Sequence, residues 1–327
     1  MLRRHVTKSS LALALLVAIC RSAGAEERCV LKGEPVMPQA AGIYDAPSEG
    51  KEIGHFTGAK VALTVTSFAE SSGGRDLIET TGFRIKGFVR ASDVPAFTTR
   101  QVPVYGGHLS IGEGRRVSVI GSGPGRLHVE RAALSPIAGV FQGWAPCEAV
   151  SLSPKVPPGW TPPGGARGYL AKRPKLEIFD KPSGDVVTSL TKAGDGPGIL
   201  FWGADAKDGF VHVELHADIV IDAWARTRDL NALPPGETMD QVAPSTAQPG
   251  VPKIQLQGRA KVVRTPTAVP LRAAATDAAV AIGGIDAGVD VIVVDVVAGW
   301  ASVMPASLTI APSGAAQFWT RARDLGI

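Results

Sequence analysis

Short runs of alternating apolar and polar residues fill most of the 327-residue chain. The clearest run covers residues 211–221, where nearly every odd-numbered residue is aliphatic. Successive side chains of a β-strand point to opposite faces, so this run predicts a strand, or a bent pair of strands, with one face in the core. Turns rich in Gly and Pro separate the runs, and convincing helical periodicity is absent. The pattern predicts an all-β protein.

Four segments of the chain end alike, which indicates an internal repeat. In each, an aromatic residue is followed six positions later by an aliphatic one. The pairs are Phe88 and Val94, Trp144 and Val150, Trp224 and Leu230, and Trp319 and Leu325. The beginnings match too, since IYDAPSEGKEIG at 43–54 is echoed by IFDKPSGDVVTSL at 178–190. We expect each all-β unit to close into a small barrel, because open strand edges invite aggregation.

Two proline-rich stretches, at 151–168 and 231–252, separate the later units. Proline cannot donate to a strand ladder, so we expect these stretches to be extended spacers. The sequence therefore predicts a packed pair of units followed by two more loosely tethered ones. The expected division is a signal peptide at 1–25, barrels at 26–98, 99–152, 169–233 and 254–327, and linkers at 153–168 and 234–253.

The first residues have the pattern of a secretory signal peptide. A positive start, the apolar run LALALLVAI at 11–19 and the small residues AGA at 23–25 follow one another. Cys20 raises a lipoprotein alternative, but Ile19 before it and Arg21 after it fit that pattern badly. No later stretch is long and apolar enough to cross a bilayer. We expect an exported protein, periplasmic or extracellular.

Removing that signal changes the charge of the protein. The whole chain carries a formal charge of +4, and residues 1–25 hold four Lys or Arg and no Asp or Glu. The mature chain is therefore formally neutral. A neutral protein without a basic stripe is a poor candidate for binding nucleic acid.

Cys29 and Cys147 remain after cleavage, and in an oxidising compartment such a pair usually forms a disulfide. A free or intermolecular thiol is the alternative. Cys147 occupies the position where the other units have small residues (Ala91, Thr227 and Ala322). A bond would tie the start of the first unit to the end of the second, and we expect only these two units to gain stability.

His212, Glu214 and His216 would share one face of the strand at 211–221, with Asp218 following them. Imidazole and carboxylate groups are usual zinc ligands, so these three residues are the candidate metal ligands. Equivalent positions in other units lack a consistent ligand set, which favours a solvated face without a metal or other cofactor.

The repeated residues Trp144, Trp224 and Trp319 are expected in the barrel cores, because aromatics dominate small cores. Trp160 and Trp202 lie outside the repeat pattern. These two are the candidate binding residues, since exposed tryptophan is enriched at interfaces.

An early [IV][YF] pair with Pro and Gly after it, a strand like GWASV at 299–303 and a closing W-x-R-x-x-D-L together resemble bacterial SH3-like (SH3b) domains. The resemblance implies tandem small barrels that bind cell-wall peptides, glycans or envelope proteins, and it carries over no ligand residues. No stretch is left for a catalytic domain, and a Gly-x-Ser-x-Gly elbow is absent. We therefore expect an exported, non-enzymatic binding or scaffold protein of the cell envelope. The alternatives are a metal-binding protein or enzyme centred on His212, Glu214 and His216, and a spacer that binds nothing.

Overall fold

The computed structural model describes residues 28–133, 135–195, 198–234 and 261–327. These residues form β-strands and four short 3-10 helices, which confirms the predicted all-β class. The strands build two antiparallel sheets, one of 13 and one of 14 strands. No helix among these residues is long and apolar enough to span a membrane. The predicted signal peptide, including Cys20, and most of the second proline-rich stretch lie outside the described residues.

Four segments of the chain supply the strands. The first holds β1 (Leu31–Gly33), β2 (Gly42–Tyr44), β3 (Glu52–Phe56), β4 (Leu63–Ser67), β5 (Arg75–Thr80) and β6 (Phe83–Arg90). The second holds β7 (Ala96–Thr98), β8 (Val102–Val104), η1 (Tyr105–Gly107), β9 (Leu109–Ile111), β10 (Arg116–Gly123), β11 (Arg126–Ala133), β12 (Ile137–Pro146), η2 (Cys147–Ala149) and β13 (Val150–Ser151). The third holds β14 (Arg167–Ala171), β15 (Lys175–Phe179), β16 (Val186–Lys192), β17 (Leu200–Lys207), β18 (Phe210–His216), β19 (Ile219–Arg226), η3 (Thr227–Asp229) and β20 (Leu230–Ala232). The fourth holds β21 (Lys261–Arg264), β22 (Val269–Arg272), β23 (Ala281–Ile285), β24 (Asp290–Val297), β25 (Trp300–Pro305), β26 (Ile310–Pro312), β27 (Phe318–Arg321) and η4 (Ala322–Leu325).

The first, third and fourth segments share one strand order. The six main strands of a segment are all its strands except β13, β20 and β26. Numbered along the chain from first to sixth, they lie in the sheet in the order first, fourth, fifth, sixth, second, third. The second segment follows the same order, except that β8 packs beside β12 without forming a ladder with it. A 3-10 helix follows the sixth strand in the last three segments.

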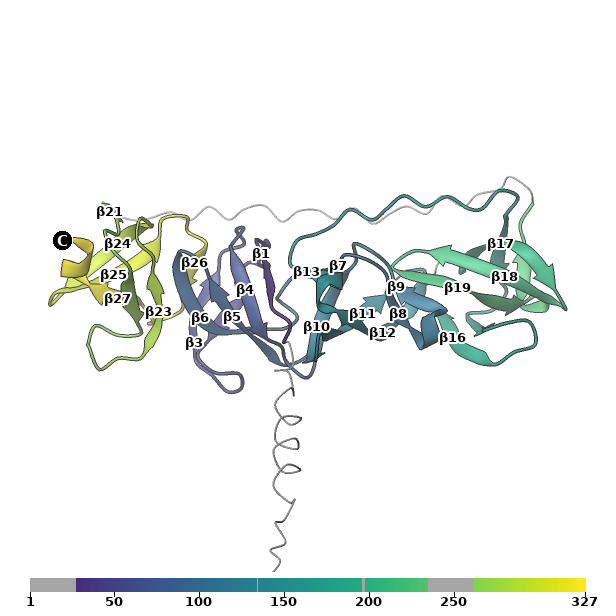
Figure 1. The fold of residues 1–327 in the computed structure, drawn as a ribbon, viewed down its shortest axis with the longest axis horizontal. Helices are drawn as coiled ribbons and strands as arrows, with labels where there is room; N and C mark the ends of the chain where they lie inside the picture. Colours follow the sequence, from purple (N-terminus) through teal and green to yellow (C-terminus); the bar gives the residue numbers. More distant parts are fainter. Residues whose placement is uncertain (1–27, 134, 196–197, 235–260) are drawn as a thin grey trace, which may run out of the picture.

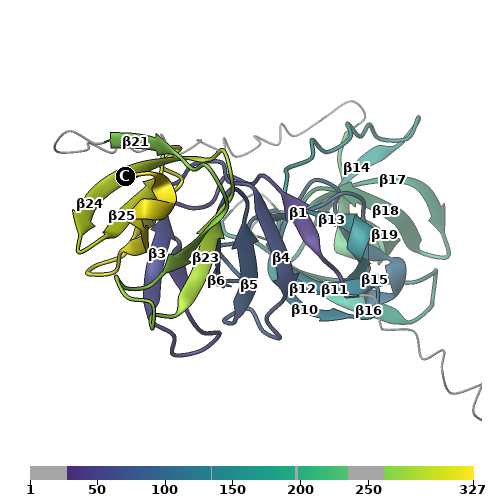
Figure 2. The same cartoon turned by 60° about the vertical axis from the view of Figure 1, so that its left-hand side comes forward.

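The third main strand of every segment pairs with a neighbouring segment. β23 pairs with β6 and β3 with β26, which joins the first and fourth segments. β16 pairs with β12 and β9 with β19, which joins the second and third. The segments therefore lie in a row in the order fourth, first, second, third (Figure 1), and Figure 2 shows β23 alongside β6.

This arrangement corrects two expectations. The described ladders do not close any segment into a barrel of its own, and the last two segments are not loosely tethered. Close backbone approach at the β6–β23 ladder depends on Gly283, where an added Cβ would lie 1.9 Å from the carbonyl oxygen of Arg84. The proline content of a linker specifies its stiffness but not the strand on which the tethered segment docks.

The predicted alternation along residues 211–221 is present. Val211, Val213, Leu215, Ile219 and Ile221 are all buried. Buried apolar side chains from all four segments belong to one hydrophobic cluster that continues across the segment boundaries. The core therefore supports the joined sheets as well as the individual segments.

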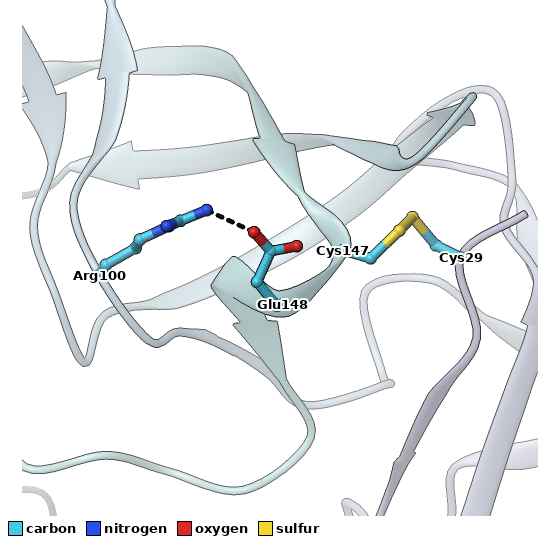
Figure 3. Close-up of a disulfide and its surroundings, with 4 residues drawn as sticks. All are labelled: Cys29, Arg100, Cys147 and Glu148. Atoms are coloured by element: carbon cyan, nitrogen blue, oxygen red, sulfur yellow. Dashed lines mark hydrogen bonds and ion pairs between the residues drawn. A yellow bond between two sulfur atoms is a disulfide. The ribbon is translucent and has the colours of Figure 1, made fainter. Parts of the chain in front are cut away.

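Cys29 and Cys147 form the predicted disulfide, with Cα atoms 5.4 Å apart. The bond ties Cys29, two residues before β1, to the first residue of η2, beside an ion pair in which Arg100 donates to Glu148 at 2.7 Å (Figure 3). Leu152 lies against Gly33 of β1. A Cβ atom added at Gly33 would be only 3.0 Å from the Cβ atom of Leu152. The disulfide therefore joins the two sheets where β1 approaches β13.

Removing this disulfide should weaken the full-length protein. The cysteines are 118 residues apart, for which chain entropy gives an upper figure of about 4–5 kcal/mol. We expect a Cys29→Ser, Cys147→Ser variant to unfold at lower denaturant concentration than the oxidised protein. Reductant should bring the natural chain down to the variant and leave the variant unchanged. Identical unfolding of the natural chain with and without reductant would contradict this role.

Asp76 is a buried carboxyl in the first segment. It faces the core from β5, is 1% exposed, and accepts a hydrogen bond from the backbone N–H of Ala69 at 2.8 Å. Burial raises its pKa to about 7, and the Ala69 hydrogen bond only partly opposes this shift. The folded protein therefore holds a proton on Asp76 at pH values where the unfolded chain has released it.

The raised pKa of Asp76 predicts the direction in which stability changes with pH. Between about pH 4 and about pH 7 the folded state binds more protons at Asp76 than the unfolded state, so stability falls as pH rises, by at most about 1.4 kcal/mol per pH unit. Asp76→Asn keeps an acceptor for Ala69 and removes the titration. Denaturant unfolding across this range should give a smaller decline for the variant than for the natural chain. Parallel stability profiles would refute the prediction.

Candidate binding face

One outward face of β17, β18 and β19 gathers most of the candidate residues. Glu214 on β18 lies opposite Trp202 on β17 and Asp222 on β19. His212 lies opposite Trp224 one pair further along. We call this surface the tryptophan–histidine face; it consists of Trp160, Trp202, His212, Glu214, His216, Asp222 and Trp224.

His212 is held by a carboxylate and an indole. Its Nε2 lies 2.6 Å from Oδ1 of Asp222, and its ring centroid lies 5.1 Å from that of Trp224. The side chain of Asp222 is 68% exposed. The backbone N–H of Asp222 donates to the carbonyl oxygen of His108, from the second segment. Residues on both sides of the segment boundary thus position this end of the face.

His216 lies under Trp160, which comes from the first proline-rich stretch. The two rings stack with centroids 4.3 Å apart and planes 11° apart. Burial lowers the pKa of His216, and the carboxylates of Glu214 and Asp222 oppose the shift. Further back in the same stretch, Lys155 forms an ion pair with Glu113 at 2.6 Å. Between residues 152 and 166 this stretch has no regular strand, and the contacts of Lys155 and Trp160 anchor it to the second and third segments.

The acid pair Glu214–Asp222 is unusual among the segments. Like charges directly opposite each other on antiparallel strands are destabilising. At the equivalent register, other segments place a compensating partner opposite the glutamate. These pairs are Glu79–Lys86 in the first segment and Glu130–Gln142, hydrogen-bonded at 2.7 Å, in the second. In the third segment the two acids contact histidines instead: Asp222 pairs with His212 at 2.6 Å, and Glu214 lies 3.9 Å from His216.

The predicted metal ligands share the face but do not converge on one point. His212 is engaged with Asp222, while Nε2 of His216 lies 3.9 Å from Oε2 of Glu214. Alternate residues of a strand are separated by almost 7 Å along the chain direction, roughly twice the strand rise. Within the described residues, no group of three or more His, Cys, Asp or Glu side chains is placed to hold a metal ion.

The prediction that the repeated tryptophans fill the core is wrong. Trp144 is 44% exposed, stacks on His128 at 4.8 Å and lies under the guanidinium of Arg126 at 4.6 Å. Trp224 and Trp319 are half-buried. Their neighbours in the chain are buried instead, such as Ala223 and Ala225 around Trp224, so the tryptophans occupy outward positions of their strands.

Asp222 and Trp224 are the site residues that the sequence reasoning missed. Both lie on the outward side of β19, on alternate positions from Ala223 and Ala225. Applying the strict period of two to this strand would have placed them outward. Trp160 and Trp202, the predicted binding residues outside the repeat pattern, lie on the same face, on His216 and opposite Glu214 respectively.

No protein-family model, curated protein or solved structure matches this chain. The function must therefore be argued from the geometry of the face.

The Trp160–His216 stack predicts a pH response. Because the pKa of His216 is lowered in the folded protein, its contribution to stability is present above about pH 6.5 and is lost as pH falls below that value. Trp160→Ala should expose the imidazole and move its pKa back toward the ordinary value. NMR titration of the His216 ring would measure this, with Trp144→Ala as the matched control. An unchanged pKa in Trp160→Ala would contradict the proposed shielding.

Proposed function

We propose that this chain is an exported, non-enzymatic binding or scaffold protein of the bacterial cell envelope, built from tandem SH3-like modules. The strand order common to the four segments, with a 3-10 helix after the sixth strand in three of them, supports the module interpretation. The disulfide supports an oxidising compartment. We further propose that the tryptophan–histidine face binds glycan strands of the cell wall.

The observation that carries this proposal is a pair of carboxylates, Glu214 and Asp222, on the same outward face as Trp202 and Trp224. Trp202 and Trp224 are half-buried, so part of each indole is open to solvent. The apolar C–H face of a sugar ring can pack on an indole, while its hydroxyls donate hydrogen bonds to Glu214 and Asp222. A few convergent polar groups beside aromatic surface are typical of small-molecule sites. A bound glycan would therefore pack on the indoles and donate hydrogen bonds to the two carboxylates at the same time.

The other residues of the tryptophan–histidine face favour glycan binding at the end that lies away from His216. Trp160 already covers His216, so the end of the face near that residue is occupied by the chain itself. The open part therefore lies along Trp202, Glu214 and Trp224. Fixing His212 against Asp222 limits the rearrangement required when a ligand arrives.

Binding can be tested with purified cell-wall glycan. We expect the full-length protein to sediment with insoluble peptidoglycan, and Trp202→Ala with Trp224→Ala to weaken binding at least tenfold. That factor corresponds to roughly 1.4 kcal/mol, within the range of an aromatic hot spot. Trp144→Ala is the matched control, because it removes an exposed tryptophan from the second segment.

Two outcomes would overturn the proposal. One is undiminished binding by the double tryptophan variant while circular dichroism shows an intact fold. The other is release of soluble glycan fragments by the natural chain that is lost in Glu214→Gln, which would replace a binding role with an enzymatic one centred on this strand.

A further inference from the structure

The first strand of each segment has an outer edge, and three of these edges are covered. β13 pairs with β7, and β20 pairs with β14. Leu152 and Ser153 lie against β1 at Gly33, beside the disulfide. In the fourth segment, β21 pairs only with β24 among the described residues. The outer edge of β21 is therefore the one first-strand edge that the described chain leaves uncovered.

The conformation after η4 explains the difference. In the third segment the chain leaves η3 in an extended form, and Leu230–Ala232 runs antiparallel to β14. In the fourth segment, Gly326 adopts a φ of 73°, which favours glycine. The N–H of Ile327 then donates to the carbonyl oxygen of Ala322, so residues 326–327 fold back on η4. They do not follow β21.

The side chains of β21 are more exposed than those of the covered first strands. Lys261, Val262 and Arg264 are exposed, with Val262 at 59%, and Val263 is half-buried. By contrast, two of the five residues of β14 are buried. Val262 and Val263 lie between two cations on a strand whose outer edge pairs with no described residue. Such an edge can accept an added strand.

The charges of Lys261 and Arg264 indicate which kind of strand can pair with the outer edge of β21. Neither Lys261 nor Arg264 has an ion-pair partner within the described residues, although Asp290 lies opposite Arg264 in the ladder. A second copy pairing antiparallel on the same edge would place Lys261 opposite Arg264, which is repulsive. Within the chain, the strands that cover such edges follow an acidic residue in each case, Glu148 before β13 and Asp229 before β20.

We propose that the free edge of β21 binds an extended, acidic segment of a partner protein as an added antiparallel strand. Backbone hydrogen bonds to β21 supply the attachment, and carboxylates pairing with Lys261 and Arg264 select the partner. This inference is independent of glycan binding, because β21 belongs to the other sheet from the tryptophan–histidine face.

Fluorescence anisotropy with labelled peptides tests the proposal on the full-length protein. We expect the acidic peptide DVTVE to bind at least about tenfold more tightly than the basic peptide KVTVK at low salt. A DVTVE peptide with N-methylated backbone amides should not bind, because it cannot donate ladder hydrogen bonds. Lys261→Glu with Arg264→Glu should reverse the preference, whereas Lys32→Glu with Lys86→Glu, a matched pair of exposed lysines on β1 and β6, should not.

Hydrogen exchange supplies the second readout. On saturation with DVTVE, the amides of β21 that point away from β24 should become more protected, while β1 stays unchanged. Absence of binding by either peptide would overturn the proposal. So would strong protection, in the free protein, of the β21 amides that point away from β24, which would show that the chain covers this edge itself. Concentration-dependent dimerisation abolished by the β21 charge reversal would assign the edge to a second copy instead.

Discussion

Unpaired strand edges are the constraint on which the whole arrangement depends. Each segment is too small a sheet to satisfy both edges by itself, and exposed backbone N–H and C=O groups at an edge invite association. The third main strand of each segment therefore pairs with a strand of a neighbouring segment, as β23 does with β6 and β16 with β12. Because these pairings are reciprocal, two ladders join the segments within each sheet.

The junction between the two sheets is of a different kind. No ladder crosses it among the described residues, and the two sheets meet through the Cys29–Cys147 bond and the packing of Leu152 on Gly33. A covalent tie takes the place of hydrogen-bonded strands at the point where the first and second segments follow each other directly in the chain. The row of four segments thus has ladders in its two halves and a disulfide at its centre.

The sequence predicted those parts of the fold that depend on local periodicity. Alternation identified the buried side of β18, and the same period placed His212, Glu214 and His216 together on its other side. The cysteine pairing followed from compartment and count. Strand pairing between segments could not be predicted, since backbone hydrogen bonds carry little side-chain information and the close approach depends on a glycine at Gly283. The position of Trp160 could not be predicted either, because a proline-rich stretch has no periodicity that would indicate where its side chains point.

The proposed binding face of the third segment can be compared with the equivalent register positions of the other segments. A cross-strand pair with an outward aromatic recurs in every segment: Leu77–Phe88, His128–Trp144, His212–Trp224 and Ser302–Trp319. In the second segment the aromatic is already occupied, because Trp144 contacts both His128 and Arg126. In the third segment, Phe210 stands at the position of Arg126, and Arg226 lies over Phe179 and pairs with Glu177. Among the described residues, no arginine or lysine lies over the Trp224 ring. The same outward position therefore carries an exposed tryptophan between a histidine and an arginine in the second segment, and a half-buried tryptophan beside His212 and Asp222 in the third.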